Sequence, residues 1–254
     1  MKKMLLLVAA AGLLSLAAAQ GGSADSAYMC TGTLDDPGFV TGMPKDVVVP
    51  PGNACILEGV TVTHDVTVQT GASLGVDNST IGHDVKADGA AFFEFIGYTG
   101  PIHVGHDVVL TGTSPNAQSF GGYDICDATI GHDLSITGAN VADEIEVGDN
   151  GPQDNEFCAF PGPQPDSIGH DVTVSNNTAG KVDVGNNSIG HDLNVNSNTA
   201  STSTSDTGGI GVDDNTVNHD ATCTGNSPGL TADGPEDGPN HVGHKDTGCE
   251  AARS

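Results

Sequence analysis

The chain has 254 residues, which is enough for one large domain or two small ones. It carries a formal net charge of −26 at pH 7, with 33 acidic residues against 7 Lys and Arg, and it has no Trp. So negative a surface repels nucleic acid and anionic membranes, and we therefore expect neither nucleic-acid binding nor membrane insertion.

The first 19 residues have the pattern of a secretory signal peptide. Lys2 and Lys3 form a basic start, residues 5–16 are apolar, and three Ala residues at 17–19 supply a cleavage site. The apolar stretch is too short to span a bilayer comfortably. We predict residues 1–19 to be removed and the mature protein to be secreted, to the extracellular space, the cell surface or a periplasm.

All six cysteines lie in the predicted exported part of the chain. An even number of cysteines in an oxidising compartment predicts three disulfides, with a set of free thiols as the alternative. Sequential pairing is the simplest of the fifteen connectivities, and the sequence does not decide among them. Sequential pairing would join Cys30 to Cys55, Cys126 to Cys158, and Cys223 to Cys249.

Residues 20–60 are rich in Pro and Gly, as in Pro37-Gly38 and Pro50-Pro51-Gly52. We expect this segment to form an N-terminal cap, because the open end of a stacked fold exposes unpaired backbone groups and invites aggregation.

From residue 61 one short phrase recurs. It begins with a branched apolar residue, which is usually followed by Gly. His-Asp comes next, and then apolar and polar residues alternate, as at 130–136 and 189–195. Most copies follow one another by 19 to 28 residues, which is the signature of a solenoid whose coils stack on one another. The eight histidines are His64, His83, His106, His132, His170, His191, His219 and His244.

The residues after each His-Asp predict a strand. The positions two and four after His are apolar in all the copies from His64 to His219, and the positions between and beyond them are mostly Thr, Ser or Asn. This period of two indicates one buried and one solvated face. A second, weaker strand recurs at 74–78, 145–150, 182–187 and 210–215 and ends in Gly, Asp or Asn, which tolerate tight corners. We predict an all-β parallel β-helix solenoid of about eight coils, with two or three strands per coil, Asn-rich turns and N- and C-terminal caps.

The repeat region is expected to cover residues 61–224. It is interrupted near 142–167 by a segment rich in Pro and Gly, which we predict to be an inserted loop. Residues 225–254 are expected to form the last coil and the C-terminal cap.

The repeat resembles that of secreted bacterial right-handed parallel β-helix proteins, whose coils read Ile-Gly-Gly-Asn-Leu-x-Val/Cys-x-Gly-Asn. Here His and Asp usually replace the second Gly and the Asn, and the resemblance covers about residues 60–249. It implies this architecture and says almost nothing about activity.

The His-Asp pairs are the main candidate for chemistry. In-register stacking would line up the aspartates about 4.8 Å apart, which costs about 0.9 kcal/mol per neighbouring pair in water. Backbone N–H groups at a corner, imidazoles of the same or the next coil, or divalent cations could offset this repulsion. Carboxylates suit Ca²⁺, whereas added imidazoles favour Zn²⁺, Ni²⁺ or Cu²⁺. The competing interpretation is a purely structural turn. The candidate metal ligands are His83, Asp84, His106, Asp107, His132, Asp133, His170, Asp171, His191 and Asp192.

These patterns favour a non-catalytic secreted or cell-surface solenoid with a structural or binding role. Its repeated polar face would contact glycans, divalent cations or further copies of the chain. The alternative is a polysaccharide-active enzyme, either a glycoside hydrolase or a lyase, on the same scaffold. Against it, the Gly-His-Gly and Arg-x-Lys phrases of such β-helix enzymes are missing, and the chain has a single Arg.

Overall fold

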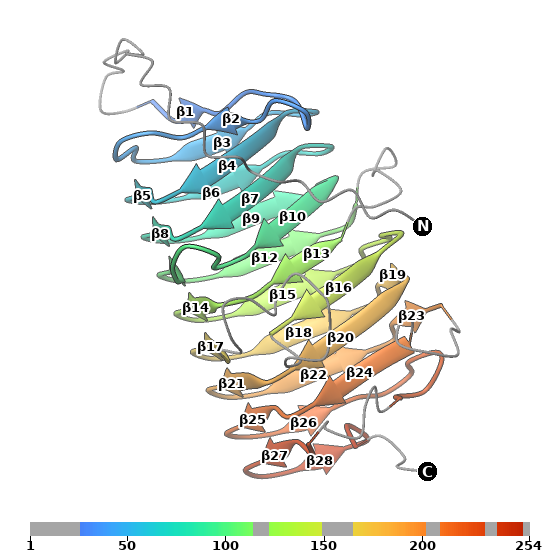
Figure 1. Cartoon of the computed structure of the whole chain (residues 1–254). Helices are drawn as coiled ribbons and strands as arrows, with labels where there is room; N and C mark the ends of the chain where they lie inside the picture. Colours follow the sequence, from blue (N-terminus) through green and yellow to red (C-terminus); the bar gives the residue numbers. More distant parts are fainter. Residues whose placement is uncertain (1–25, 114–121, 149–164, 202–208, 232–237, 251–254) are drawn as a thin grey trace.

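The computed structural model describes residues 26–113, 122–148, 165–201, 209–231 and 238–250. These residues form no helix; their strands stack into three long parallel sheets along one axis, which is a parallel β-helix (Figure 1). The predicted all-β solenoid fold is confirmed. The predicted signal peptide at 1–19 lies outside the described residues.

Sheet A holds the strands that follow each His-Asp pair, and the predicted strand at this position is confirmed. Its ten strands, in spatial order, are β1 (Tyr28–Met29), β3 (Val47–Val49), β6 (Val66–Val68), β9 (Val85–Asp88), β12 (Val108–Thr111), β15 (Leu134–Thr137), β18 (Val172–Ser175), β22 (Leu193–Asn196), β26 (Ala221–Thr222) and β28 (Asp246–Thr247). Every neighbouring pair is parallel and in register, so that equivalent residues of successive coils lie side by side.

Sheet B contains the second, weaker strand of the repeat. Its eight strands are β2 (Gly38–Phe39), β4 (Ala54–Glu58), β7 (Ser73–Asp77), β10 (Phe92–Phe95), β13 (Tyr123–Ile125), β16 (Glu144–Val147), β20 (Lys181–Gly185) and β24 (Gly209–Asp213). The repeat pattern alone did not identify β10 and β13 as members of this set.

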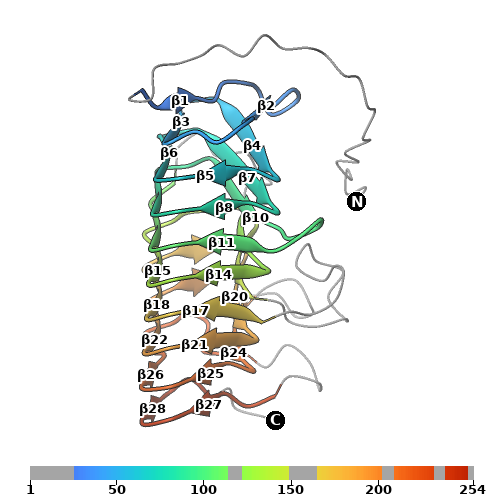
Figure 2. The same ribbon diagram turned by 90° about the vertical axis from the view of Figure 1, so that its left-hand side faces the viewer.

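Sheet C is made by the residues just before each Gly-His step, and it faces the viewer in Figure 2. Its strands are β5 (Thr61–Val62), β8 (Thr80–Ile81), β11 (Ile102–Val104), β14 (Ala128–Ile130), β17 (Asp166–Ile168), β21 (Asn187–Ile189), β25 (Thr216–Val217) and β27 (His241–Val242). Each complete coil therefore has three strands, in the chain order C, A, B. A small fourth sheet pairs β19 (Thr178–Ala179) with β23 (Thr199–Ala200).

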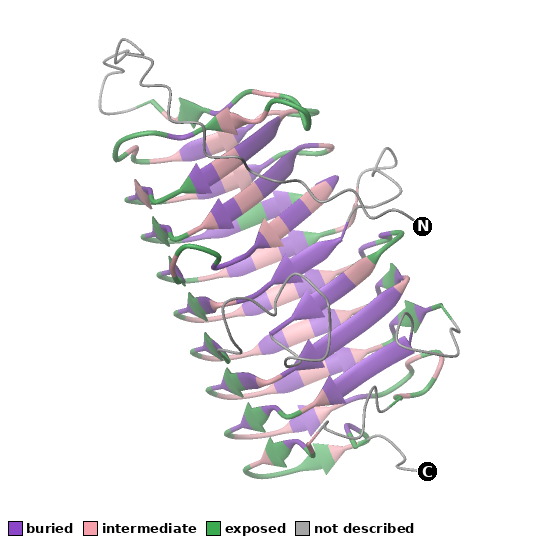
Figure 3. Ribbon diagram, in the orientation of Figure 1, coloured by how far each residue is buried: buried purple, intermediate pink, exposed green. Residues whose placement is uncertain are grey.

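The core is a continuous column of mostly aliphatic side chains between the three sheets. Figure 3 shows buried residues on the strands along the whole stack. The inward positions of sheet A, such as Leu134 and Ile136, are fully buried, and Ser135 between them is only partly buried. Three aromatic rings widen the column in the middle of the stack: Phe93 lies 4.9 Å from Phe95 and 6.5 Å from Tyr123, measured between ring centroids. Since each coil contributes few aliphatic groups, stability accumulates along the stack.

Asparagines close the corners, as the sequence predicted. At the corner between sheets B and C, Asn187 donates from Nδ2 to the carbonyl of Val147, and its own backbone N–H donates to Oδ1 of Asn215. Asn215 repeats this pattern one coil later with Val184 and Asn240. The residues that directly follow several sheet-B strands adopt the left-handed backbone conformation expected of Asn and Asp at tight turns, for example Asn186, after β20, at φ 53°.

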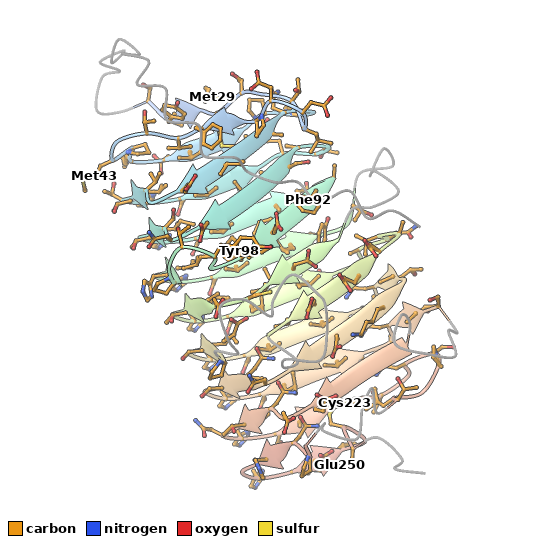
Figure 4. All side chains as sticks on the ribbon, viewed as in Figure 1. Met29, Met43, Phe92, Tyr98, Cys223 and Glu250 are labelled. Atoms are coloured by element: carbon orange, nitrogen blue, oxygen red, sulfur yellow. A yellow bond between two sulfur atoms is a disulfide. The ribbon has the colours of Figure 1, made fainter. Side chains whose placement is uncertain are left out.

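The solenoid already includes residues 28–58. Strands β1 and β3 continue sheet A, and β2 and β4 continue sheet B, so this segment pairs in register with the repeats that follow. The end that it forms exposes several large apolar side chains, among them Met29, Phe39 and Met43; Figure 4 labels the two methionines.

Two of the three predicted disulfides are confirmed: Cys30–Cys55 at the N-terminal end and Cys223–Cys249 at the C-terminal end. None of the described cysteines is a free thiol. The predicted partner of Cys126, Cys158, lies outside the described residues, as do residues 149–164 of the expected loop. The flanks of that expected loop belong to the solenoid, because 144–147 is strand β16 and 166–168 is strand β17.

Candidate functional site

The His-Asp pairs lie at the bend between sheet C and sheet A. In each coil the sheet C strand ends two residues before the histidine, and the sheet A strand begins two residues after it. The bend turns the histidine out of the core, and the side chains from His64 to His219 are 42–48% exposed. The histidines thus lie between two strands and do not point into the core.

Each aspartate of this corner binds the following coil through one oxygen atom. Oδ1 of Asp133 accepts a hydrogen bond from Nδ1 of His170 at 2.9 Å and another from the backbone N–H of Asp171 at 3.0 Å. The same pair of bonds occurs in eight successive steps, with distances of 2.7–2.9 Å to the imidazole and 3.0–3.3 Å to the N–H. We call this array the His–Asp ladder. Two of the compensations expected for the aligned carboxylates, backbone N–H groups and imidazoles of the next coil, are thus present.

The ladder fixes the tautomer of its histidines. Nδ1 of His170 lies between Oδ1 of Asp133 and Oδ2 of Asp171, the latter at 3.4 Å. Ionised carboxylates only accept hydrogen bonds, so Nδ1 must carry the proton. In the neutral ring Nε2 is then the unprotonated nitrogen. Within the described part of the chain, the ladder histidines make their hydrogen bonds through Nδ1 and none through Nε2.

The eight imidazole rings form one continuous stack. Neighbouring ring centroids are 4.6–5.1 Å apart, and the ring planes are within 12° of parallel. The spacing narrows from 5.1 Å between His64 and His83 to 4.6 Å between His191 and His219. Because every ring is held by the same pair of contacts, the Nε2 atoms repeat along the stack at nearly the same spacing as the rings.

The charges of the ladder stabilise one another. Hydrogen bonds to Asp107 and Asp171 raise the pKa values of His132 and His191, respectively. Burial raises the pKa of Asp84, but its bonds to Lys86, to His106 and to the Asp107 N–H outweigh this effect and leave the pKa at about 2. Lys86, on the outer face of β9, reaches Oδ2 of Asp84 at 2.6 Å.

Lysines stand at both ends of the ladder. Lys45 occupies the histidine position of the first step, where its carbonyl accepts the His64 N–H, and Asp46 is the first carboxylate. Lys245 takes the aspartate position of the last step, where its N–H donates to Asp220. Asp46 could not be recognised from the repeat because no His precedes it.

Glycine precedes six of the eight ladder histidines, with Thr63 and Asn218 before the other two, and it allows the coils to approach closely. A Cβ atom built at Gly169 would overlap the carbonyl oxygen of Gly131 in the preceding coil, and the same holds for Gly190 against Gly169. The Gly-His step therefore belongs to the stacking geometry as much as the aspartate does.

A second cluster, which was not predicted from the sequence, lies on sheet B. Glu94, Asp124, Glu146 and Asp183 occupy the same register position in four successive strands, between Gly75 and Gly211. They stand between inward-facing apolar residues, as Glu94 does between Phe93 and Phe95. The residue in the middle of each sheet-B strand could have revealed this row of carboxylates. It did not, because β10 and β13 were not recognised as equivalent to the other strands of sheet B.

These carboxylates are largely withdrawn from water. Asp124, Glu146 and Asp183 are each less than 5% exposed, and burial raises the pKa of Glu94 to about 7. Lys181 donates to Asp183 at 2.7 Å. Burial, together with the charges of Glu94, Asp77 and Asp124, raises the pKa of Tyr98, which Figure 4 labels beside this sheet.

All ten residues predicted as metal ligands lie in the His–Asp ladder, where groups such as His132, Asp133 and His170 bring their possible ligand atoms within 4.8 Å of one another. The inner side of such a group is occupied by Nδ1 protons and by bonds to Oδ1. The outer edge, lined by Nε2 atoms, is the part of the ladder open to a ligand.

None of the described residues forms a helix long and apolar enough to cross a membrane. No family model, no curated protein and no solved structure matches the chain. The fold and the repeated contacts of the ladder are therefore the basis for any functional conclusion.

Proposed function

We propose that this protein is an exported, non-catalytic solenoid with a binding or structural role, and that the face bearing the His–Asp ladder is its contact surface. The ligands that suit this face are divalent cations and the hydroxyl groups of glycans. The two disulfides at the ends of the stack fit an oxidising compartment and support the proposal of secretion.

One observation carries the proposal: the same contacts recur in eight successive steps along the whole stack. An enzyme concentrates its chemical groups in one cleft, whereas a repeated surface suits a repetitive ligand or a structural role. An outward-facing row beside the ladder is aligned in the same register and widens the surface. It consists of six polar side chains and one apolar side chain: Thr67, Lys86, Ser135, Thr173, Asn194 and Thr222, with Val109.

The test is a binding screen of the mature protein with its disulfides intact, against immobilised glycans and against divalent cations after treatment with EDTA. His132→Gln in the middle of the ladder should weaken binding, and His103→Gln, on the outer face of β11, is the matched control. A ligand bound equally well by both variants would place the contact surface elsewhere.

The carboxylate row of sheet B supports a second candidate, a polysaccharide-active enzyme. Glycoside hydrolases need two carboxyl groups, one of them protonated near neutral pH. Glu94, with its pKa of about 7, lies one coil from Asp124 and fits the role of the acid. Release of reducing sugar from a panel of polysaccharides, abolished by Glu94→Gln, would favour this candidate over the non-catalytic one.

A further inference from the structure

The outer edge of the ladder has the features of a metal-binding surface built from imidazoles. Each ring is oriented by a carboxylate on Nδ1, as Asp171 orients His191 at 2.8 Å. A carboxylate on one ring nitrogen fixes the tautomer and makes the other nitrogen a better ligand, and metal-binding histidines usually have such a partner. In this ladder the partner is in place for all eight rings.

We propose that the ladder binds divalent transition-metal ions of the Zn²⁺, Ni²⁺ and Cu²⁺ class through the Nε2 atoms of histidines in neighbouring coils. This inference rests on the proposed function, since it names the ligand of the surface assigned there. The aspartates orient the rings and contribute negative charge, and they do not contact the ion.

The donor set separates this class of ions from Ca²⁺. Calcium takes six to eight oxygen ligands, whereas imidazole nitrogen suits Zn²⁺, Ni²⁺ and Cu²⁺. Oδ1 of each ladder aspartate from Asp46 to Asp220 already accepts two hydrogen bonds from the next coil. A calcium ion bound through Oδ1 would compete with the bonds that hold the coils together.

The ring spacing identifies the first site to fill. With a metal–nitrogen distance of about 2.0–2.1 Å, one ion can hold two nitrogens at most about 4.2 Å apart. His191 and His219, with centroids 4.6 Å apart, are the closest pair, and His170 is 4.7 Å from His191. These half-exposed rings must tilt toward each other to bring two Nε2 atoms within this limit, and the 5.1 Å pairs at the N-terminal end must tilt further.

The net charge favours the same ligand. A surface with a formal net charge of −26 attracts cations, and each coil of the ladder adds a carboxylate beside the imidazole. Lysine replaces a ladder residue only at the two ends of the ladder, at Lys45 and Lys245. A cation bound in the middle of the ladder is therefore surrounded by imidazole and carboxylate groups of several coils.

The test is isothermal titration calorimetry of the mature, disulfide-bonded protein with ZnCl₂ and NiCl₂ at pH 8, after EDTA treatment and in a buffer that does not bind metals. We expect both ions to bind, with a more than tenfold loss of affinity at the tightest site in His191→Gln/His219→Gln. The control His103→Gln/His241→Gln removes two exposed histidines outside the ladder and should bind as the unmodified protein does.

A second readout covers the case in which the double variant is destabilised. In the unmodified protein, ¹⁵N resonances of His191 and His219 should show Zn²⁺ bound at Nε2, with Nδ1 still protonated. Equal affinity in the two double variants, coordination at Nδ1, or displacement of Zn²⁺ by equimolar Ca²⁺ would overturn the inference. If metals do not bind but a glycan does, and His132→Gln weakens that glycan binding, the metal inference falls and the proposed function stands.

Discussion

Replacing Asp133 with Ala removes the carboxylate from the middle of the ladder and tests whether the ladder holds the coils together. Oδ1 of Asp133 accepts two bonds, from His170 Nδ1 and from the Asp171 N–H. A bond to a charged group contributes about 1.5–3 kcal/mol, and the partial exposure of this carboxylate favours the lower limit, so the two bonds together stabilise by about 3–4 kcal/mol. The change also relieves repulsion from Asp107 and Asp171, by about 1 kcal/mol in total after screening at physiological salt. The expected net loss is about 2–3 kcal/mol.

Urea unfolding followed by circular dichroism would measure this loss, and hydrogen exchange at the Asp171 amide would localise it, since repeat proteins can unfold in parts. Asp133→Asn keeps an acceptor at Oδ1 and should lose only about 1 kcal/mol. Asp88→Ala, at an exposed position at the end of β9, is the control and should change stability by less than about 0.5 kcal/mol. If Asp133→Ala is as stable as Asp88→Ala, and the Asp171 amide stays protected, the ladder does not hold the coils together.

Three further predictions concern stacking and charge. Gly169→Ala should lose about 1–3 kcal/mol in the same urea assay because its Cβ would overlap the Gly131 carbonyl, whereas Gly229→Ala, which meets no atom within 4 Å, should not. The free energy of unfolding should fall as pH rises from 5 to 8.5, because the pKa values of His132, His191 and Glu94 are raised in the folded state. The stabilisation from protonating these groups is complete at low pH and is lost as pH rises through the raised pKa values. A thermal melt that is independent of pH over this range would contradict it. Glu94→Gln should make this pH dependence shallower, and an unchanged profile would show that Glu94 is ionised throughout.

Much of the architecture could be predicted because the inward positions of sheet A are apolar in almost every copy of the repeat. A one-residue shift of register would expose them all, so the pattern determines both the strand and its parallel stacking. Sheet B was predicted only in part. Asp124 lies eight residues before His132, the same spacing that separates Asp183 from His191, so its register was present in the sequence. Phe93-Glu94-Phe95 and Tyr123-Asp124-Ile125 were not recognised because they differ in composition from the Val- and Ile-rich copies, and the row of four carboxylates therefore became visible only in the structure.

The composition of the ladder was predicted, but its contacts were not. Sequence spacing places the His-Asp pairs in one row without showing which coil an aspartate contacts. The answer depends on the bend at the Gly-His step, which lets Asp107 reach forward to His132 and to the N–H of Asp133. For the same reason Asp46 and Lys245, which close the ladder without a complete His-Asp phrase, become visible only in three dimensions.

The most direct test of the ladder is the protonation of its imidazoles, measured by ¹⁵N NMR of the histidine side chains at pH 8.5. The structure predicts Nδ1 protonated and Nε2 unprotonated in the eight ladder histidines. The comparison is with the two histidines outside the ladder, His103 and His241, whose rings make no hydrogen bond to any aspartate among the described residues. Ladder histidines protonated at Nε2 would mean that Nδ1 does not donate to the aspartate of the preceding coil, and would contradict both the ladder and the metal surface inferred from it.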